Sequence, residues 1–230
     1  AFERPEPAVR FALRALAADP NNERVDALLS VERTHTSGVG VELETLLDKL
    51  LDHNEALPIR RRNQLLELLA ALRESRPDGA HEALLTWSQL LKLNPTRRDM
   101  VLRLIHAALQ QGEYGIAAEG LVTFLWSTEA FDAELFEECQ RLAPDHSEIE
   151  QWCKAIEAQL LIRSKASRTP AQSRALFGCE RALGGIYESK LNDSFGALRC
   201  AERALVLLPS SSETGHDVAR LLRDLGRWPE

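Results

Sequence analysis

Histidine and cysteine are the side chains of this sequence whose chemistry can be judged most directly from their spacing. The six histidines are scattered, and no two of them stand four residues apart, as a helical metal site would require. The four cysteines are separated by 14, 26 and 21 residues, which fits neither a zinc ligand set nor a redox Cys-x-x-Cys motif. We therefore expect no metal or cofactor. We interpret the cysteines as buried free thiols, with structural disulfides as the alternative.

The motifs of common enzyme classes are also missing from the sequence. Gly38-Val39-Gly40 stands between two predicted helices and not after a strand, so it indicates neither a dinucleotide fold nor a phosphate loop. No Gly-x-Ser-x-Gly nucleophile motif occurs. Carboxylate pairs are frequent, but they fall on predicted solvated helices, where no apolar pocket would separate their pKa values. The sequence predicts a protein that is not an enzyme.

Composition and charge exclude several classes of protein. Of the 230 residues, 44% are hydrophobic, which is too many for a disordered chain. The net charge of −7 disfavours nucleic acid as a partner. The longest stretch without a charged residue is nine residues, whereas a membrane-spanning helix needs about 20. We therefore expect no membrane insertion.

Apolar residues recur at spacings of three and four along most of the chain, which predicts helices and almost no strand. Turn-forming residues such as Asp19-Pro20, Asn94-Pro95 and Leu208-Pro209 interrupt this pattern at regular intervals, so each helix is short. The predicted helices cover residues 7–18, 23–34, 41–54, 59–76, 80–93, 97–111, 114–126, 129–142, 147–163, 170–190, 194–207 and 212–225.

One pattern of packing residues recurs along these helices. A small residue is followed by small or bulky residues four and seven residues later and by a proline twelve residues later. The copies are Ala8-Ala12-Ala15-Pro20, Ala83-Trp87-Leu90-Pro95 and Ala197-Ala201-Ala204-Pro209, with Ala117-Leu121-Phe124 as a fourth that lacks the proline. The fourth copy lies 34 residues after the second. Self-similarity at such a period is typical of helical repeat proteins, with the alanines placed where two helices pack closely.

These residues resemble the tetratricopeptide repeat (TPR), a helix-turn-helix unit. The best match is the stretch from Leu104 to Phe124, with Gly112 and Tyr114 at the turn and Ala117 at the close-packing position. The resemblance implies an all-α fold: a right-handed α-α superhelix of about six antiparallel helix pairs, as one TPR-like domain over residues 1–230. Residues 129–170 lack the pattern, and we expect an irregular helix pair there. Because both ends fall in the middle of a repeat, we expect the chain to be part of a longer protein.

A TPR-like solenoid implies a function in binding. The first helix of each pair lines the concave face, so we expect a protein-protein interaction module or scaffold that binds a peptide or helix of another protein there. The alternative is a regulatory or substrate-recruiting arm of a larger enzyme or transcription regulator. Reduced cysteines and the lack of a leader favour a cytoplasmic location. The predicted partner-binding residues are Asp99, Leu102, His106, Gln110, Arg181, Glu188, His216, Arg220 and Arg223.

Three charged clusters allow more than one interpretation. Residues 129–150 contain eight acidic residues against one arginine, which indicates a solvated helix face or a patch for a basic partner. Residues 163–174 contain four basic residues and no acid, and we interpret them as a mobile connection. Arg60-Arg61-Arg62 opens a helix where the helix dipole disfavours positive charge, so this cluster is a candidate contact for phosphate or an acidic partner.

Overall fold

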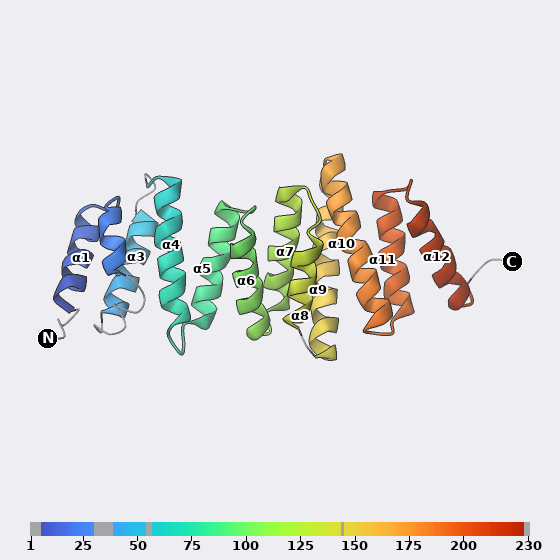
Figure 1. Cartoon of the computed structure of the whole chain (residues 1–230), viewed down its shortest axis with the longest axis horizontal. Coiled ribbons are helices and arrows are strands. Elements are labelled where there is room, and N and C mark those ends of the chain that lie inside the picture. The colour runs from blue at the N-terminus through green and yellow to red at the C-terminus, as the bar shows by residue number, and fades with distance from the viewer. Residues whose placement is uncertain (1–5, 30–38, 54–56, 144, 228–230) are drawn as a thin grey trace. The chain divides into compact units, whose positions relative to one another are not determined.

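The computed structural model describes residues 6–29, 39–53, 57–143 and 145–227, and these residues form helices and no strand (Figure 1). The helices are α1 (Glu6–Ala18), the 3-10 helix η1 (Glu23–Leu28), α3 (Gly40–His53), α4 (Ile59–Glu74), α5 (Ala80–Leu93), α6 (Arg98–Gln110), α7 (Tyr114–Thr128), α8 (Ala133–Arg141), α9 (His146–Ser164), α10 (Pro170–Ser189), α11 (Ser194–Leu207) and α12 (Ser212–Asp224). The predicted all-α class is therefore confirmed.

Two predicted helices differ from the observed ones. Only residues 23–28 of the predicted 23–34 helix are seen, as a single 3-10 helix, and residues 30–38 lie outside the described ranges. The helix predicted from residue 129 begins instead at Ala133. Glu129 has a left-handed φ of 55°, which ends α7, and the Asp132 carboxylate caps α8 by accepting a hydrogen bond of 2.8 Å from the Leu135 amide.

The chain divides into two compact units, Ala1–Asn94 and Pro95–Glu230. In the first unit α1 packs on η1 and α3, α3 packs on α4, and α4 packs on α5. The buried side chains on each helix are spaced by three or four residues, so the apolar stripe read from the sequence is the surface that packs. Its largest members are Leu16, Leu43, Leu47, Leu65, Leu69, Leu84, Trp87 and Leu90.

The second unit is built on helix pairs, with α6 on α7, α10 on α11, and α12 on α11. The α8–α9 region departs from this regular pairing, because α9 packs mainly on α7 while the nine-residue α8 packs on α6 and α10. Contact between α8 and α9 includes the rings of Phe136 and Trp152, whose centroids are 5.5 Å apart. The single repeat domain and its superhelical handedness stay predictions.

Small residues allow two close contacts in the second unit. A Cβ atom at Gly196 would lie 2.5 Å from the Tyr187 ring, and one at Gly178 would lie 2.6 Å from the Phe131 ring. Such distances are well inside van der Waals contact, so a larger residue at position 196 would force α10 and α11 apart, and one at position 178 would displace Phe131 in the α7–α8 connection. The close α10–α11 pair depends on the glycine at position 196.

The repeated packing motif behaves as predicted in some helices and not in others. All three positions are buried in α5 (Ala83, Trp87, Leu90) and in α7 (Ala117, Leu121, Phe124). In α1 the predicted packing role of Ala8 is wrong, because Ala8 is exposed. The buried face of α1 runs through Val9, Ala12, Leu13 and Leu16, so Ala12 packs as predicted while Val9 is buried where Ala8 was expected.

Replacing Trp87 with alanine should destabilise the first unit by about 3–5 kcal/mol. The indole is only 2% exposed, so the change leaves a cavity, and the hydrogen bond of 2.5 Å that its Nε1 donates to the exposed Glu74 is lost to water. Urea unfolding followed by circular dichroism measures the loss. Leu85→Ala on the same helix is the control, because Leu85 is 47% exposed. Equal losses in the two variants would show that Trp87 is not a core residue.

Candidate functional site

The four predicted binding residues on α6 lie along one side of that helix. Asp99, His106 and Gln110 are exposed and Leu102 is half-buried. His106 Nε2 and Gln110 Nε2 are 3.1 Å apart. Hydrogen bonds from Arg97 lower the pKa of Asp99. These residues therefore share one side of α6. The polar contacts of Asp99, His106 and Gln110 given above are with residues two to four positions away in the sequence.

The predicted binding residues on α10 and α12 are joined across the two helices. Arg181 donates two hydrogen bonds, of 2.8 and 2.6 Å, to the Glu213 carboxylate. Arg220 donates two, of 2.6 and 2.9 Å, to Glu188, and these bonds lower the pKa of Glu188. These bidentate pairs link α10 to α12. His216 and Arg223 of α12 are exposed.

The arginine cluster at the start of α4 attaches that helix to its neighbours. Arg61 is buried, and its guanidinium donates to the Asp26 carboxylate at 2.5 and 2.9 Å and to the Pro20 carbonyl at 2.7 Å. Arg62 donates a hydrogen bond of 2.9 Å to the Leu51 carbonyl in the last turn of α3, where positive charge is favourable. These contacts within the first unit explain why Arg61 and Arg62 stand at the start of α4, where the helix dipole alone disfavours positive charge.

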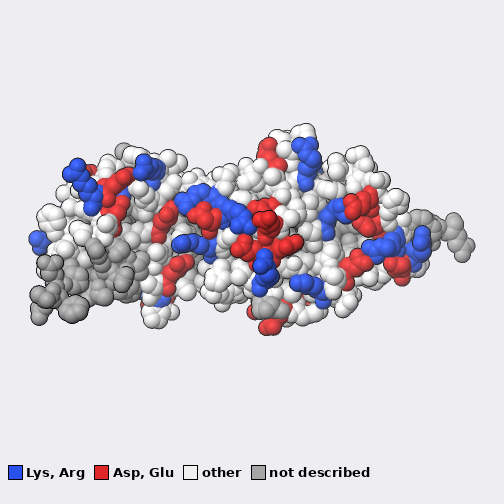
Figure 2. Space-filling model, in the orientation of Figure 1, with Lys and Arg blue, Asp and Glu red and all other residues white. Residues whose placement is uncertain are grey.

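Part of the acidic stretch has a structural role as well. Arg98 reaches the carboxylates of Asp132 at 3.2 Å and Glu138 at 3.1 Å, which links α6 to α8. Glu134 and Glu137 are exposed, as a solvated face requires. Figure 2 shows acidic and basic side chains adjoining one another on the face that it draws.

All four cysteines are buried free thiols, as predicted. Burial raises the pKa of Cys139 and Cys153 to about 12, and it raises the pKa of Cys179 and Cys200 as well. Thiols that remain protonated near neutral pH are poor nucleophiles. Across residues 6–29, 39–53, 57–143 and 145–227, no three His, Cys, Asp or Glu side chains are grouped as a metal site would need.

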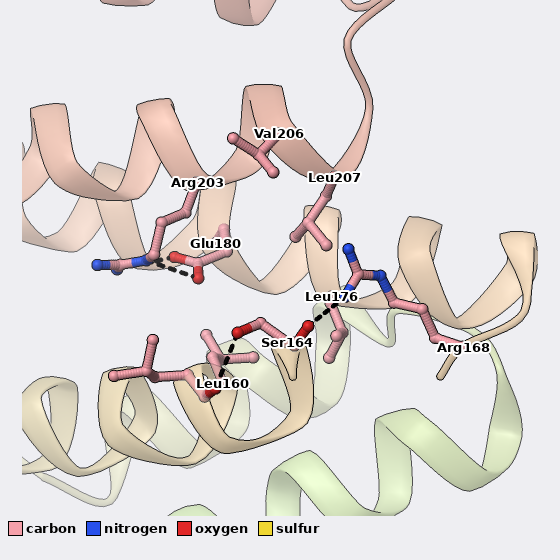
Figure 3. A pocket seen from close by; sticks show the side chains of 9 residues that line it. Leu160, Ser164, Arg168, Leu176, Glu180, Arg203, Val206 and Leu207 are labelled. Atoms are coloured by element: carbon pink, nitrogen blue, oxygen red, sulfur yellow. Dashed lines mark hydrogen bonds and ion pairs between the residues drawn. The ribbon is translucent and has the colours of Figure 1, made fainter. Parts of the chain in front are cut away.

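A pocket of about 230 Å³ opens among three helices of the second unit (Figure 3). Its lining comes from the last turns of α9 and α11, the α9–α10 connection and the middle of α10. We call it the α9–α11 pocket. It is lined by Leu160, Leu161, Ser164, Arg168, Leu176, Glu180, Arg203, Val206 and Leu207. The wall is aliphatic, and Figure 3 places Arg203 and Glu180 at one end and Arg168 at the other.

One end of the α9–α11 pocket is closed by a buried ion pair. Glu180 accepts hydrogen bonds of 2.8 and 2.9 Å from Arg203, which also donates one of 2.7 Å to Glu157. Glu157 in turn accepts a hydrogen bond of 2.6 Å from the Tyr187 hydroxyl. Burial raises the pKa of Glu180, and the Arg203 guanidinium opposes this effect. Each charge at this end already has its partners.

The other end of the pocket is formed by a short, anchored connection. Thr169 begins α10 with a capping box, in which its hydroxyl accepts from the Gln172 amide at 3.1 Å and the Gln172 side chain accepts from the Thr169 amide at 2.9 Å. Arg168, directly before this cap, donates to the Ser164 carbonyl at 2.7 Å and to the Ser173 hydroxyl at 3.2 Å. These bonds hold the guanidinium beside the pocket.

Apolar side chains remain exposed at the edge of the pocket. Val206 is 73% exposed and Leu161 is 52% exposed. Large aliphatic groups that adjoin a cavity and remain in water mark a surface that another molecule can cover. The sequence analysis missed this wall, and none of the nine predicted binding residues lines it. The signal in the sequence was the basic stretch 163–174, which the sequence analysis interprets as a mobile connection.

A second pocket, of about 310 Å³, lies in the first unit and is lined by Leu51, Asp52, Arg62, Leu66, Gln89, Lys92 and Leu93. Charged and polar side chains are mixed with leucines along its wall, and Arg62 is already engaged by the end of α3. The α9–α11 pocket is the better candidate because its apolar groups are contiguous and its charged groups lie at the ends.

Comparison with protein-family models gives no match, and comparison with curated protein sequences gives none either. In the part of the chain that the structure describes, no helix is both long and apolar enough to cross a membrane. The functional conclusion therefore depends on the geometry of the chain itself.

Arg61→Gln should destabilise the first unit by about 3 kcal/mol, the lower end for breaking a buried pair, because the partly exposed Asp26 can regain water. Urea unfolding measures the loss. Arg60→Gln is the matched control, since Arg60 is 78% exposed and lies 3.7 Å from Glu23. If Arg61→Gln leaves the free energy of unfolding unchanged, the arginine cluster would again be a candidate contact for phosphate or an acidic partner.

The link between α10 and α12 should depend on pH. Because Arg220 lowers the pKa of Glu188 below its usual 4.5, the pair stabilises the fold above that pH and loses its effect as the pH falls through the lower folded value. The free energy of unfolding should differ between wild type and Glu188→Gln by less than about 1 kcal/mol at neutral pH, as for exposed pairs. The difference should shrink as the pH falls below 4.5 and vanish once Glu188 is protonated in the folded state as well. A difference that does not change with pH would contradict this role.

Proposed function

We propose that this chain is a protein-binding module of the TPR-like class, and that the α9–α11 pocket receives a side chain from a segment of another protein. The observation that carries the proposal is the aliphatic wall with exposed Leu161 and Val206 at its edge. A volume of about 230 Å³ is below the range of about 300–1,000 Å³ that holds a whole small molecule, so one bulky side chain is the better fit.

The nine residues expected on the concave face stay predicted contacts of the same module. Arg181, Glu188 and Arg220 are already satisfied by bidentate partners, so a ligand there would exchange one ion pair for another with little net gain. The α9–α11 pocket has no such competitor along its apolar wall. This difference makes the pocket the stronger anchor point.

A regulatory or substrate-recruiting arm of a larger enzyme or transcription regulator is the second form of the proposal. Such an arm would bind its segment at the same pocket and would deliver it to another domain of the larger protein. The experiment below tests the surface that both forms share.

Replacing the exposed apolar groups should weaken binding without harming the fold. Peptides selected from a phage-displayed library of random linear sequences against the full chain should bind Leu161→Gln/Val206→Gln about 10- to 100-fold more weakly, the value of burying a Leu or Val side chain. Fluorescence anisotropy with the selected peptides measures this. Phe195→Gln is the matched control, because Phe195 is 52% exposed on α11 and does not line the pocket.

Two outcomes would refute the assignment of the pocket. Peptides whose affinity is unchanged in the Leu161→Gln/Val206→Gln variant bind elsewhere. Peptides that depend on Arg220 and not on Val206 would place the site on the α10–α12 face predicted from the sequence.

A further inference from the structure

Arg168 differs from Arg203, the other arginine that lines the α9–α11 pocket, in having no carboxylate partner. Its hydrogen bonds go to neutral oxygens, the Ser164 carbonyl and the Ser173 hydroxyl, and no ion pair joins it to an acid in the described ranges. Arg203 at the opposite end has two carboxylates, those of Glu180 and Glu157. A guanidinium carries five N–H donors, so Arg168 keeps donors for a further acceptor.

The positive charge of Arg168 is reinforced along the same connection. Lys165 follows the pocket residue Ser164 directly, and Arg174 stands early in α10; both are exposed, and neither forms an ion pair with a described residue. No acid occurs in the sequence between Glu157 and Glu180. One carboxylate reaches the connection from another element, that of Glu129, which accepts a hydrogen bond of 3.2 Å from the Thr169 hydroxyl and forms no ion pair with Arg168. In a chain with a net charge of −7, three cations beside one carboxylate leave this end of the pocket locally positive.

We infer that the segment bound in the α9–α11 pocket is acidic: a bulky aliphatic or aromatic side chain fills the leucine and valine cavity, and a neighbouring Asp or Glu carboxylate pairs with Arg168. This inference rests on the proposed function and specifies its partner. The aliphatic wall and the cation adjoin in Figure 3, and a peptide presents both complementary groups on neighbouring residues.

The same arrangement selects against other segments. A basic side chain placed beside Arg168 would meet a like charge, and an apolar one would cover the guanidinium without satisfying it. The closed Glu180–Arg203 end offers no free carboxylate to attract a basic peptide. Charge at one end and apolar surface along the wall together determine where the acidic and the apolar side chains of the segment lie in the pocket.

The library selection described above also tests this inference. Sequences enriched on the full chain should contain Leu, Ile, Phe or Trp with Asp or Glu one to four positions away. Replacing the acid of a selected peptide with glutamine should weaken binding about tenfold, and added salt should weaken the acidic peptide more than the glutamine peptide.

Charge reversal gives a readout that a purely structural role of Arg168 would not produce. Arg168→Glu should bind the acidic peptide at least about tenfold more weakly and should regain affinity for the same peptide with lysine in place of the acid. Arg141→Glu is the matched control, since Arg141 is an exposed arginine at the end of α8 in the same unit that neither lines the pocket nor belongs to the α9–α10 connection. Circular dichroism checks that each variant is folded.

The outcomes separate this inference from the proposed function. Two results would overturn the inference and leave the proposed binding module standing. One is peptides that need Val206 but show no preference for an acid. The other is an Arg168→Glu variant that does not come to prefer the lysine peptide over the acidic one. Peptides that do not need Val206 would overturn both. Self-association of the chain that is lost in the Leu161→Gln/Val206→Gln variant would also overturn the inference, because the occupant would then be a second copy.

Discussion

The apolar stripe on each helix has to be covered, and the rest of the structure depends on that requirement. Helices of 13 to 20 residues, such as α6 and α10, are barely stable alone in water, so their stability comes from the neighbours that bury the stripe. Within each unit, pairs such as α4 with α5 and α10 with α11 provide this cover. Cover ends at the last turns of α9 and α11, where Leu161 and Val206 remain in water. The α9–α11 pocket is thus one place where helix packing is incomplete.

Arginine supplies the second organising interaction. Arg61, Arg73 and Arg203 each reach carboxylates on another helix, and each is largely removed from water. A charge in such a place is stable only with its hydrogen bonds satisfied, so these pairs specify which helices lie together. Against this background Arg168 stands out, because it is held in position by neutral oxygens and has donors left over. Its charge is available to a partner in a way that the charges of the other three are not.

The proposed binding role joins these two features. An incompletely covered apolar surface gains free energy when another chain covers it, and a charge at its end selects which chain can do so. The ion pairs between α10 and α12 hold the other predicted face together, so binding there would compete with interactions that the chain already makes. The buried, protonated cysteines add no reactive group to the pocket.

Helix positions could be read from the sequence because an apolar spacing of three and four residues and a terminating proline or glycine are local properties. The α5 motif Ala83, Trp87 and Leu90 was identified correctly as core for this reason. The register of α1, in which Val9 and not Ala8 is buried, depends on which side faces α3 and η1.

Sequence alone therefore determined the all-α class, most helix boundaries and the burial of the four thiols. Tertiary structure decided which charges are engaged, as Arg61 with Asp26 shows, and where a pocket opens. The physical reason is distance along the chain. A helix is specified by residues within one or two turns, whereas the α9–α11 pocket joins Leu160, Glu180 and Val206, which become neighbours only when three helices pack.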